Sequence, residues 1–401
     1  MPRDVIASLD IGTATTRCVL AEVNSRGELR VAGLCQRPSQ GLRKGLIVDV
    51  DACARTVQEA VSSAERMAGV RVGAVYVALS TLHVALQPTR GIVTVQSEKY
   101  EVSDDDILRV VQAAKVVSLP PNREIVDLIP RQYIVDGYGG LKDPSRMVGM
   151  RLELDASLVV GNLTALSTLR RTVERAGYST ASFVLKPLAL GELVLSPEER
   201  ELGVQLVDIG AGVTEMSYFE EGALKSICVV PIGGASVSND LAVGLKISLP
   251  TAEKLKTEVD WFSMPEDRSF DLQAFGHVES RRVQPRQIID VLEPRFEELL
   301  KLICQQGEVM SGREAAPAGI ILTGGTLKTK ALARLAERLL GGIVRVKLQA
   351  VDSVDDPGFN TAFAVAAHCA SQLKLTHQPS SGRTAKGAWA RVKGIWQDFW
   401  E

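Results

Sequence analysis

The sequence predicts an α/β protein in which one domain is duplicated around a central cleft. Residues 5–15 and 204–214 are each a short apolar run that stops at Asp-Ile-Gly and continues in small and hydroxylated residues. This pattern is typical of a buried strand that ends in a tight turn, where glycine lets backbone N–H groups approach an anion. Because the copies stand at the start and near the middle of the chain, we expect paired domains that hold a phosphate chain from both sides.

The composition favours a cytosolic protein of several domains. At 401 residues the chain is long for a single core, since a domain usually takes roughly 100–200 residues. The net charge of -2 gives no reason to expect nucleic acid as a partner. Six scattered cysteines form no C-x-x-C pair, which indicates reduced thiols. We expect no signal peptide, and no apolar run reaches the roughly 18 residues of a membrane span.

Strand and helix signals alternate through the first half. They predict strands at 16–22, 29–34 and 70–79, a helix at 51–68 started by an aspartate cap, and a helix at 164–176 that ends at Gly177. Between them, residues 83–163 combine strand-like and extended segments with one helix that is capped by Ser103, and so predict a small α+β insertion. We therefore expect a first domain from residues 1–82 and 164–199, rejoined by about 355–375.

The second half repeats this plan. Its opening strand and turn lead into strand-like segments at 215–219 and 226–231, and then into a glycine-marked helix start at Pro231–Leu241. Residues 319–326 predict a buried strand that ends in a Gly-Gly turn, followed by a helix at 330–340. Such a turn lets a nucleoside lie flat against the backbone. The predicted second domain spans 200–249 and 318–354, with a helical and β subdomain at 250–317.

The two Asp-x-Gly turns and the Gly-Gly turn resemble the phosphate and nucleoside turns of the superfamily of actin, sugar kinases and heat-shock chaperone ATPases. Within it, the chain resembles the FtsA family of bacterial division proteins over essentially its whole length. The most specific stretches are Val230–Gly234, Asn239–Ala242, Ala252–Lys256, Tyr133–Gly137, Asp143–Pro144 and Met147–Gly149. The insertion at 83–163 distinguishes this family from actin-type relatives. The resemblance implies duplicated actin-like (ribonuclease H-like) domains around a central nucleotide cleft.

The resemblance also implies ATP and magnesium as ligands. Asp10 and Asp208 would face Mg²⁺ through water, which suits an ion that keeps several of its waters. The residues implied to contact the nucleotide are Gly12, Thr13, Thr15, Gly210, Ala211 and Gly212 at the phosphates, Glu253 and Lys256 beside the ribose and base, and Gly324 and Gly325 behind the adenine. An alternative left open is that these turns only punctuate the fold and bind no ATP.

Three departures from the family pattern bear on catalysis. Thr15 or Thr16 stands where relatives often place a lysine, and the second turn reads Gly-Ala-Gly where Gly-Gly-Gly is usual. Lys186 takes a position at which an acid or amide often orients the attacking water, and a protonated lysine is no general base. We expect that nucleotide binding is retained and that the chain is at most a slow ATPase, with no catalytic residue assigned.

The C-terminal segment predicts an amphipathic helix. If 387–401 is helical, the spacing brings Trp389, Val392, Ile395, Trp396, Phe399 and Trp400 to one face, with Lys393 toward the other. Residues 376–386 are a polar Pro/Ser/Gly linker. Indole rings favour the lipid headgroup boundary and lysines can snorkel outward, so we expect this helix to bind membrane lipid. The alternative is a helix that docks on the protein body or in a groove of another protein.

The resemblance implies a cell division protein that polymerises with itself and anchors the tubulin-like FtsZ ring at the division site, on the cytoplasmic face of the cell inner membrane. The insertion would contact later division proteins. Two other actin-fold classes remain open: a scaffold of pilus or secretion assembly of the PilM type, and a diverged FtsA paralogue with weak or no ATP binding. A sugar kinase would need an aspartate base in a sugar pocket, and the sequence identifies none.

Overall fold

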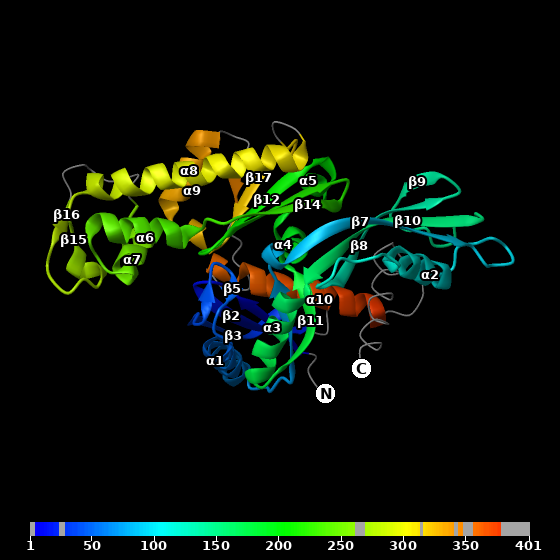
Figure 1. Cartoon of the computed structure of the whole chain (residues 1–401), viewed down its shortest axis with the longest axis horizontal. Coiled ribbons are helices and arrows are strands. Elements are labelled where there is room, and N and C mark those ends of the chain that lie inside the picture. The colour runs from blue at the N-terminus through cyan, green and yellow to red at the C-terminus, as the bar shows by residue number, and fades with distance from the viewer. Residues whose placement is uncertain are drawn as a thin grey trace.

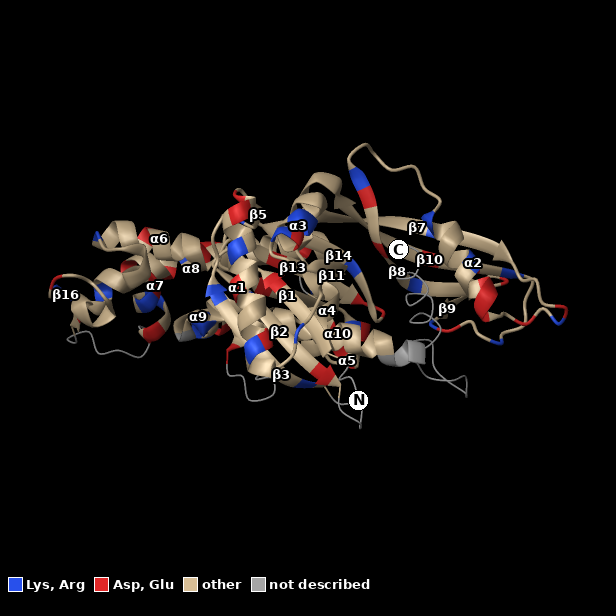
Figure 2. Ribbon diagram, turned by 90° about the horizontal axis from the view of Figure 1, so that it is seen from below, with Lys and Arg blue, Asp and Glu red and all other residues tan. Residues whose placement is uncertain are grey.

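The computed structural model describes residues 5–23, 29–260, 269–312, 316–340, 344–347 and 356–377. The molecule is elongated (Figure 1): two sheets with their helices form the middle, the helices α6 to α8 extend to one side, and a small sheet projects to the other. Lysine, arginine, aspartate and glutamate are interspersed along the ribbon (Figure 2). The amphipathic helix predicted at 387–401, with its seven candidate membrane-binding residues, lies outside the described residues.

The first sheet has the strand order β3-β2-β1-β6-β11. The first three strands are antiparallel, and β6 and β11 run parallel to β1. The helices α1 and α3 pack on one face, and α4 and α10 on the other. The bounds are β1 (Val5–Ile11), β2 (Thr15–Val23), β3 (Leu29–Pro38), β4 (Leu42–Arg43), β5 (Leu46–Ile47), α1 (Val50–Ala68), β6 (Ala74–Leu79), α3 (Leu163–Arg175), β11 (Ser179–Leu185), α4 (Lys186–Val194) and α10 (Asn360–His377).

The second sheet repeats the first, in the order β14-β13-β12-β17-β18. Again three strands are antiparallel, and two run parallel to the strand that ends in Asp-Ile-Gly. The bounds are α5 (Pro197–Leu202), β12 (Val204–Ile209), β13 (Thr214–Glu220), β14 (Ala223–Val230), β17 (Ile320–Thr323) and β18 (Val344–Val346). Equal order and direction in both sheets confirm the predicted α/β fold class with a duplicated domain.

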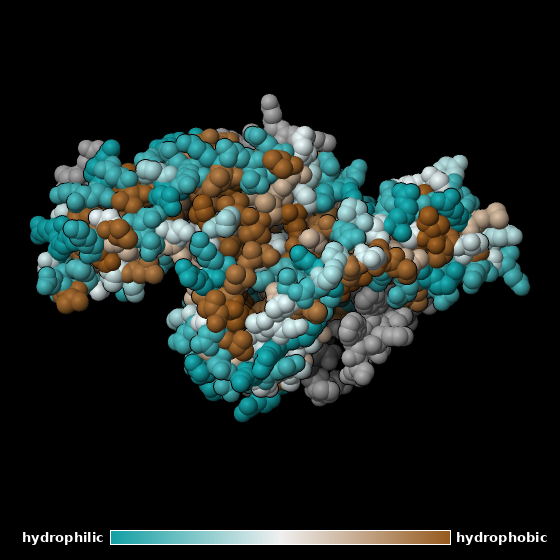
Figure 3. All heavy atoms as spheres, in the orientation of Figure 1, coloured by the Kyte–Doolittle hydropathy of each residue, from teal (hydrophilic) through white to brown (hydrophobic). Residues whose placement is uncertain are grey.

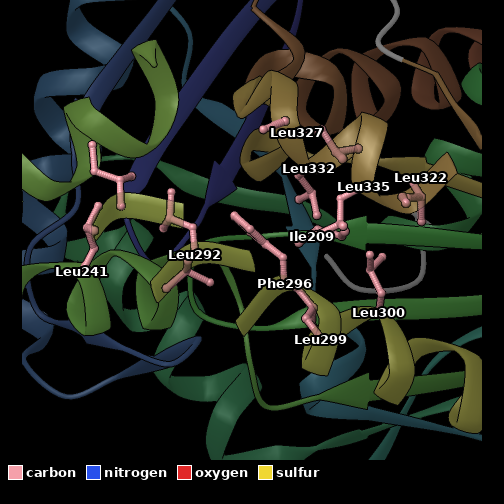
Figure 4. Packing of buried hydrophobic residues seen from close by; sticks show 14 of the residues in the cluster. Ile209, Leu241, Leu292, Phe296, Leu299, Leu300, Leu322, Leu327, Leu332 and Leu335 are labelled. Atoms are coloured by element: carbon pink, nitrogen blue, oxygen red, sulfur yellow. The ribbon is translucent and has the colours of Figure 1, made fainter. Parts of the chain in front are cut away.

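Helices cover the outer face of the second sheet. In Figure 4, Phe296, Leu299 and Leu300 of α8 point toward Ile209 of β12 and toward the leucines of α9. These residues belong to one buried cluster, so α8 and α9 are held by apolar burial. The bounds are α6 (Gly234–Leu245), α7 (Leu249–Glu258), β15 (Phe270–Asp271), η2 (Leu272–Phe275), β16 (Arg282–Val283), α8 (Pro285–Ser311), η3 (Gly325–Lys328), α9 (Lys330–Leu340) and η5 (Pro357–Phe359).

The insertion is a four-stranded sheet in the order β7-β10-β8-β9, with α2 packed on it. Ser103 caps α2 in a capping box with Asp106, as the sequence predicts for the cap. Its bounds are η1 (Thr81–His83), β7 (Val84–Thr94), α2 (Asp104–Lys115), β8 (Arg123–Val135), β9 (Tyr138–Leu141) and β10 (Arg151–Asn162). The strands β7 and β10 are antiparallel partners along their length, and Val84 faces Gly161 at one end and Thr94 faces Arg151 at the other. These two strands connect the insertion to the first domain.

A further apolar core joins the two halves. Ile6 and Val19 of the first sheet and Leu206 of the second share one buried cluster, into which α4 and α10 also pack. On the face shown in Figure 3, apolar residues gather in the middle of the molecule. Within the described ranges, no helix combines the length and the apolar character that crossing a bilayer requires.

Candidate functional site

The two Asp-Ile-Gly turns have the same internal geometry. In the first turn (residues 10–15) the Gly12 N–H donates to the Thr15 carbonyl at 3.2 Å, and in the second turn (residues 208–213) the Gly210 N–H donates to the Val213 carbonyl at 3.0 Å. Both turns follow a strand that is antiparallel to the next one. The N–H groups of these two glycines are therefore used within the turns, and the phosphate donors predicted at Thr13, Ala211 and Gly212 lie beyond them.

The two turns contact each other across the halves of the molecule. A side chain on Gly212 would place its Cβ 2.9 Å from the Cβ of Thr13, so only glycine allows this approach. The Thr13 hydroxyl oxygen accepts a hydrogen bond from the Gly45 N–H at 2.9 Å. An anion bound at this junction would meet backbone from both sheets.

Neighbouring segments brace the second turn. The first N–H groups of α6, from Gly234 and Ala235, donate to the carbonyls of Gly210 and Ala211 at 2.9 Å and 2.8 Å. The Thr326 hydroxyl also donates to the Gly210 carbonyl at 2.9 Å. This contact ties the second turn to the predicted nucleoside turn (Gly324–Thr326), so the phosphate and nucleoside elements of the prediction lie side by side.

The predicted nucleoside residues have different environments. Gly325 is open, with no heavy atom within 4 Å of a Cβ placed on it, whereas Gly324 lies against Asp208 and Ile209 at a φ of +107°. Lys256 is buried, and its Nζ donates to the Gly234 carbonyl at 3.0 Å, to Ser238 at 2.9 Å and to Glu253 at 2.7 Å. Its burial lowers the pKa of the Lys256 ammonium. Lys256 thus ties α7 to the start of α6.

A cluster of charged side chains forms the floor between the turns. We call Asp10, Asp208 and Glu215 the floor carboxylates. The Lys186 Nζ lies 3.1 Å from Asp10 Oδ1 and 3.4 Å from Glu215 Oε1. Glu215 Oε2 accepts from the Thr81 N–H at 2.6 Å and from the Thr81 hydroxyl at 2.8 Å. The floor therefore connects the first sheet, the second sheet and the base of the insertion.

These charges shift each other's ionisation. Burial alone would lower the pKa of Lys186, but Asp10, Glu215 and Asp208 raise it above its usual value, so the side chain is an ammonium. Burial raises the pKa of Asp208 to about 6; Lys186 opposes this shift, and the neighbouring carboxylates of Glu215 and Asp10 add to it. The floor is thus an acidic site that already holds one permanent cation.

The floor does not fit the predicted magnesium ion well. Asp10 Oδ1, which was to face the ion, already faces the Lys186 ammonium at 3.1 Å. A divalent ion would compete with the ammonium for this oxygen, and the two cations would repel each other. Over the described ranges, no group of three or more His, Cys, Asp and Glu side chains is arranged to hold a metal. A cavity of ≈ 10 Å³ beside Lys186, Asp208 and Glu215 has space for about one water.

Sequence reasoning missed Glu215 and Thr81 as parts of this site. Glu215 is the antiparallel partner of Asp208, and Arg17 is the corresponding partner of Asp10. The equivalent position of the two halves therefore carries opposite charges. Aligning the two strands that flank each turn would have indicated Glu215 and Arg17, because residues that face each other on antiparallel strands share one side of the sheet.

Protein-family models match two parts of the chain. The model described as the SHS2 domain inserted in FtsA matches residues 82–160. The model of cell division protein FtsA matches residues 205–364. The first match covers the four-stranded insertion, and the second covers most of the repeated half.

Curated relatives match over most of their length. Cell division protein FtsA of Bacillus subtilis is 36% identical over 361 residues, which are 89% of this chain and 82% of that protein. FtsA of Neisseria meningitidis is 30% identical over 405 residues, covering 97% of each chain. FtsA of Escherichia coli is 29% identical over 414 residues, covering 98% of this chain and 97% of that one.

Solved structures with this fold are more distant in sequence. The PilM-PilN type IV pilus biogenesis complex aligns with a TM-score of 0.64 at 19% identity, covering 92% of this chain and 99% of that one. MreB5 of Spiroplasma citri bound to ADP aligns with a TM-score of 0.54 at 13% identity, covering 92% and 98%. These likenesses show an actin-like fold. Together with the curated relatives, they establish that this chain is an actin-like protein of the FtsA cell division family.

Proposed function

We propose that this chain binds ATP between its two turns, polymerises, and anchors FtsZ to the cytoplasmic face of the cell inner membrane at the division site. The observation that carries the nucleotide part is the contact of Gly212 with Thr13, which brings the two turns together from opposite halves. Backbone N–H groups in such turns form concave sites for anions. The MreB5 structures of the same fold have ADP and AMPPNP bound, which supports a nucleotide here.

The nucleoside would lie at the Gly324–Thr326 turn. Gly325 leaves open space there, and Thr326 links this turn to the second turn through Gly210. Glu253 is predicted to lie beside the ribose. Its side chain is half exposed, so it could accept a hydrogen bond from a ribose hydroxyl. Magnesium held through water by Asp10 and Asp208 stays a prediction, and Lys186 weighs against it.

Hydrolysis is expected to be slow or absent. A general base must accept a proton, and Lys186 is held as an ammonium by the floor carboxylates. Steady-state phosphate release from the purified full chain with ATP should therefore not exceed the rate without protein by a wide margin. Robust release that Asp208→Ala abolishes would contradict this expectation.

Membrane attachment is proposed for residues 387–401. A single short amphipathic helix binds lipid reversibly, whereas many helices on one polymer bind firmly, since avidity adds a factor on the order of 10²–10⁴. Polymerisation with bound ATP would thus convert weak anchors into a stable membrane-bound filament. FtsZ, lipid and later division proteins at the insertion are the partners that this function needs.

Liposome flotation tests the anchor. The full chain with ATP should float with vesicles of mixed zwitterionic and anionic lipid, because the aromatic face inserts at the headgroup boundary. A chain that lacks 387–401 should stay at the bottom, and so should Trp396→Glu. Glu401→Gln is the matched control and should float. Flotation that persists without 387–401, or no flotation of the full chain, would count against the anchor.

A pilus-type scaffold is the second candidate, because the PilM-PilN complex shares this fold. At 19% identity that likeness concerns the fold alone. The terminal segment separates the two candidates, since the PilM type is expected to lack an amphipathic helix there. Tail-dependent flotation would thus support the FtsA function over the PilM function.

A further inference from the structure

Lys186 is a cation of the floor that the proposed nucleotide site does not yet use. It is the first residue of α4, directly after β11. A positive charge at the first turn of a helix is unfavourable, because the backbone N–H groups there already carry partial positive charge. The side chain is nevertheless only 12% exposed. The carboxylates of Asp10 and Glu215 must therefore compensate for both the burial and the helix dipole.

The position of the ammonium is fixed from both halves of the molecule. Asp10 belongs to β1 of the first sheet, and Glu215 belongs to β13 of the second. Glu215 in turn is held by two hydrogen bonds from Thr81, at 2.6 Å and 2.8 Å. Glu215 Oε2 serves Thr81, which leaves Oε1 for Lys186. Unlike a surface lysine, Lys186 has its charge held at one point by carboxylates from both sheets.

The ammonium has capacity for one further acceptor. A lysine has three N–H donors, and its ion pairs with two carboxylate oxygens engage at most two of them. A small cavity beside the ammonium has space for about one water; besides Lys186, Asp208 and Glu215 it is lined by Ser217 and by the apolar residues Pro187, Leu190, Leu206 and Met216. A phosphate oxygen at the junction of the turns would be an acceptor of suitable charge.

We propose that the Lys186 ammonium takes the place of the divalent cation at this site, so that the chain binds ATP without Mg²⁺. The inference rests on the proposed binding of ATP between the turns. A divalent ion and the ammonium would compete for Asp10, and their repulsion is strongest where water is excluded. Lys186 instead supplies positive charge between a floor carboxylate and the phosphates from the protein itself.

ATP binding to the purified full chain, measured by titration calorimetry in Mg²⁺ and in EDTA, tests this inference. The dissociation constant of the wild-type chain should change by less than about twofold between the two media. Lys186→Gln should bind ATP at least about tenfold more weakly in EDTA and recover affinity in Mg²⁺, because the removed charge is replaced by the ion. Lys186→Arg keeps the charge and should keep binding in EDTA. Lys301→Gln, at an exposed position on α8, is the matched control and should behave like the wild type.

Each other outcome has a definite meaning. If EDTA weakens ATP binding to the wild-type chain about tenfold or more, the inference is overturned, whether or not the variants fold. If Lys186→Gln binds equally well in both media, Lys186 is only a structural tie, and the inference is also overturned. If the wild-type chain binds ATP in neither medium, the proposed nucleotide function itself fails, and this inference fails with it.

Discussion

Gly324 shows at the scale of one residue how closely the nucleoside turn approaches the floor. A Cβ on Gly324 would lie 2.7 Å from the backbone N and O of Ile209 and would also collide with the Asp208 carboxylate. Its φ of +107° is a conformation that residues with a side chain rarely adopt. Gly325 has neither constraint, since nothing lies within 4 Å of its Cβ position. Two adjacent glycines therefore have different physical reasons to be glycine.

This difference predicts different costs of substitution. Gly324→Ala should lower the free energy of unfolding by about 2 kcal/mol or more, because it adds backbone strain and a collision with the floor. Gly325→Ala is the matched control and should change stability by less than about 0.5 kcal/mol. Urea denaturation followed by circular dichroism measures both variants. Equal effects of the two substitutions would mean that the contact with Asp208 and Ile209 does not constrain the turn.

Some polar residues of the floor can be found from the sequence, and others cannot. Asp10 and Asp208 end apolar runs before glycine, so a local motif finds them. Thr81 and Glu215 lie 134 positions apart in the chain, and their hydrogen bonds depend on how the halves dock. No local pattern encodes such a contact. The predicted role of each site residue in nucleotide binding stays a prediction, although the structure places the two turns together.

At the scale of single elements, the bounds of the amphipathic helices α1 and α9 could be predicted to within about one residue, whereas the mostly apolar helix α4 was not predicted. The sequence predicts α9 at 330–340, and the structure has it at Lys330–Leu340. The helix predicted at 51–68 begins at Val50, since Asp49 and not Asp51 is its cap. No helix is predicted at 186–194, where Pro187 and Gly191 are residues that often interrupt helices. In the structure Pro187 stands at the start of the helix, where its missing N–H costs nothing, and Gly191 lies against the Phe219 ring.

The short helix α5 depends on an ion pair with the far edge of the second sheet. Glu199 accepts a hydrogen bond from the Ser196 N–H at 2.8 Å, and its carboxylate lies 3.0 Å from Lys347 Nζ and 2.8 Å from Arg345. Burial alone would raise the pKa of Glu199, but these partners lower it below the usual 4.5. A carboxyl group with a lowered folded-state pKa stabilises the protein above its unfolded-state pKa. That stabilisation is lost as the pH falls through the folded-state value.

Removing this carboxylate should therefore matter at neutral pH and less in acid. Glu199→Gln is expected to lower the free energy of unfolding by about 2 kcal/mol at pH 7, since it breaks hydrogen bonds to a charged group. The difference from the wild type should shrink as the pH falls below 4.5. Urea denaturation at several pH values measures this, with the exposed Glu174→Gln as control. A pH-independent effect would show that the ion pair is not its source.

At the scale of the whole molecule, duplication was predictable, whereas docking of the halves was not. The two Asp-Ile-Gly turns predict two equivalent sheets, and both sheets have the same order of strands. The core between them joins Ile6, Leu206 and Ala362, which are distant in sequence, so no periodicity could indicate it. The domain boundaries stay predictions, and the amphipathic helix at 387–401 lies outside the described residues.

The attachment of the insertion has a mechanical consequence. The helical turn η1 runs into β7 without an intervening residue, and β10 likewise runs into α3, whose cap is Asn162. Because no loop separates these strands from the first domain, we expect the insertion to be rigidly attached to it. Thr81 of η1, directly before β7, donates two hydrogen bonds to Glu215 and so joins the root of the insertion to the floor. A displacement of Glu215 at the floor would therefore act directly on the first residues of the insertion.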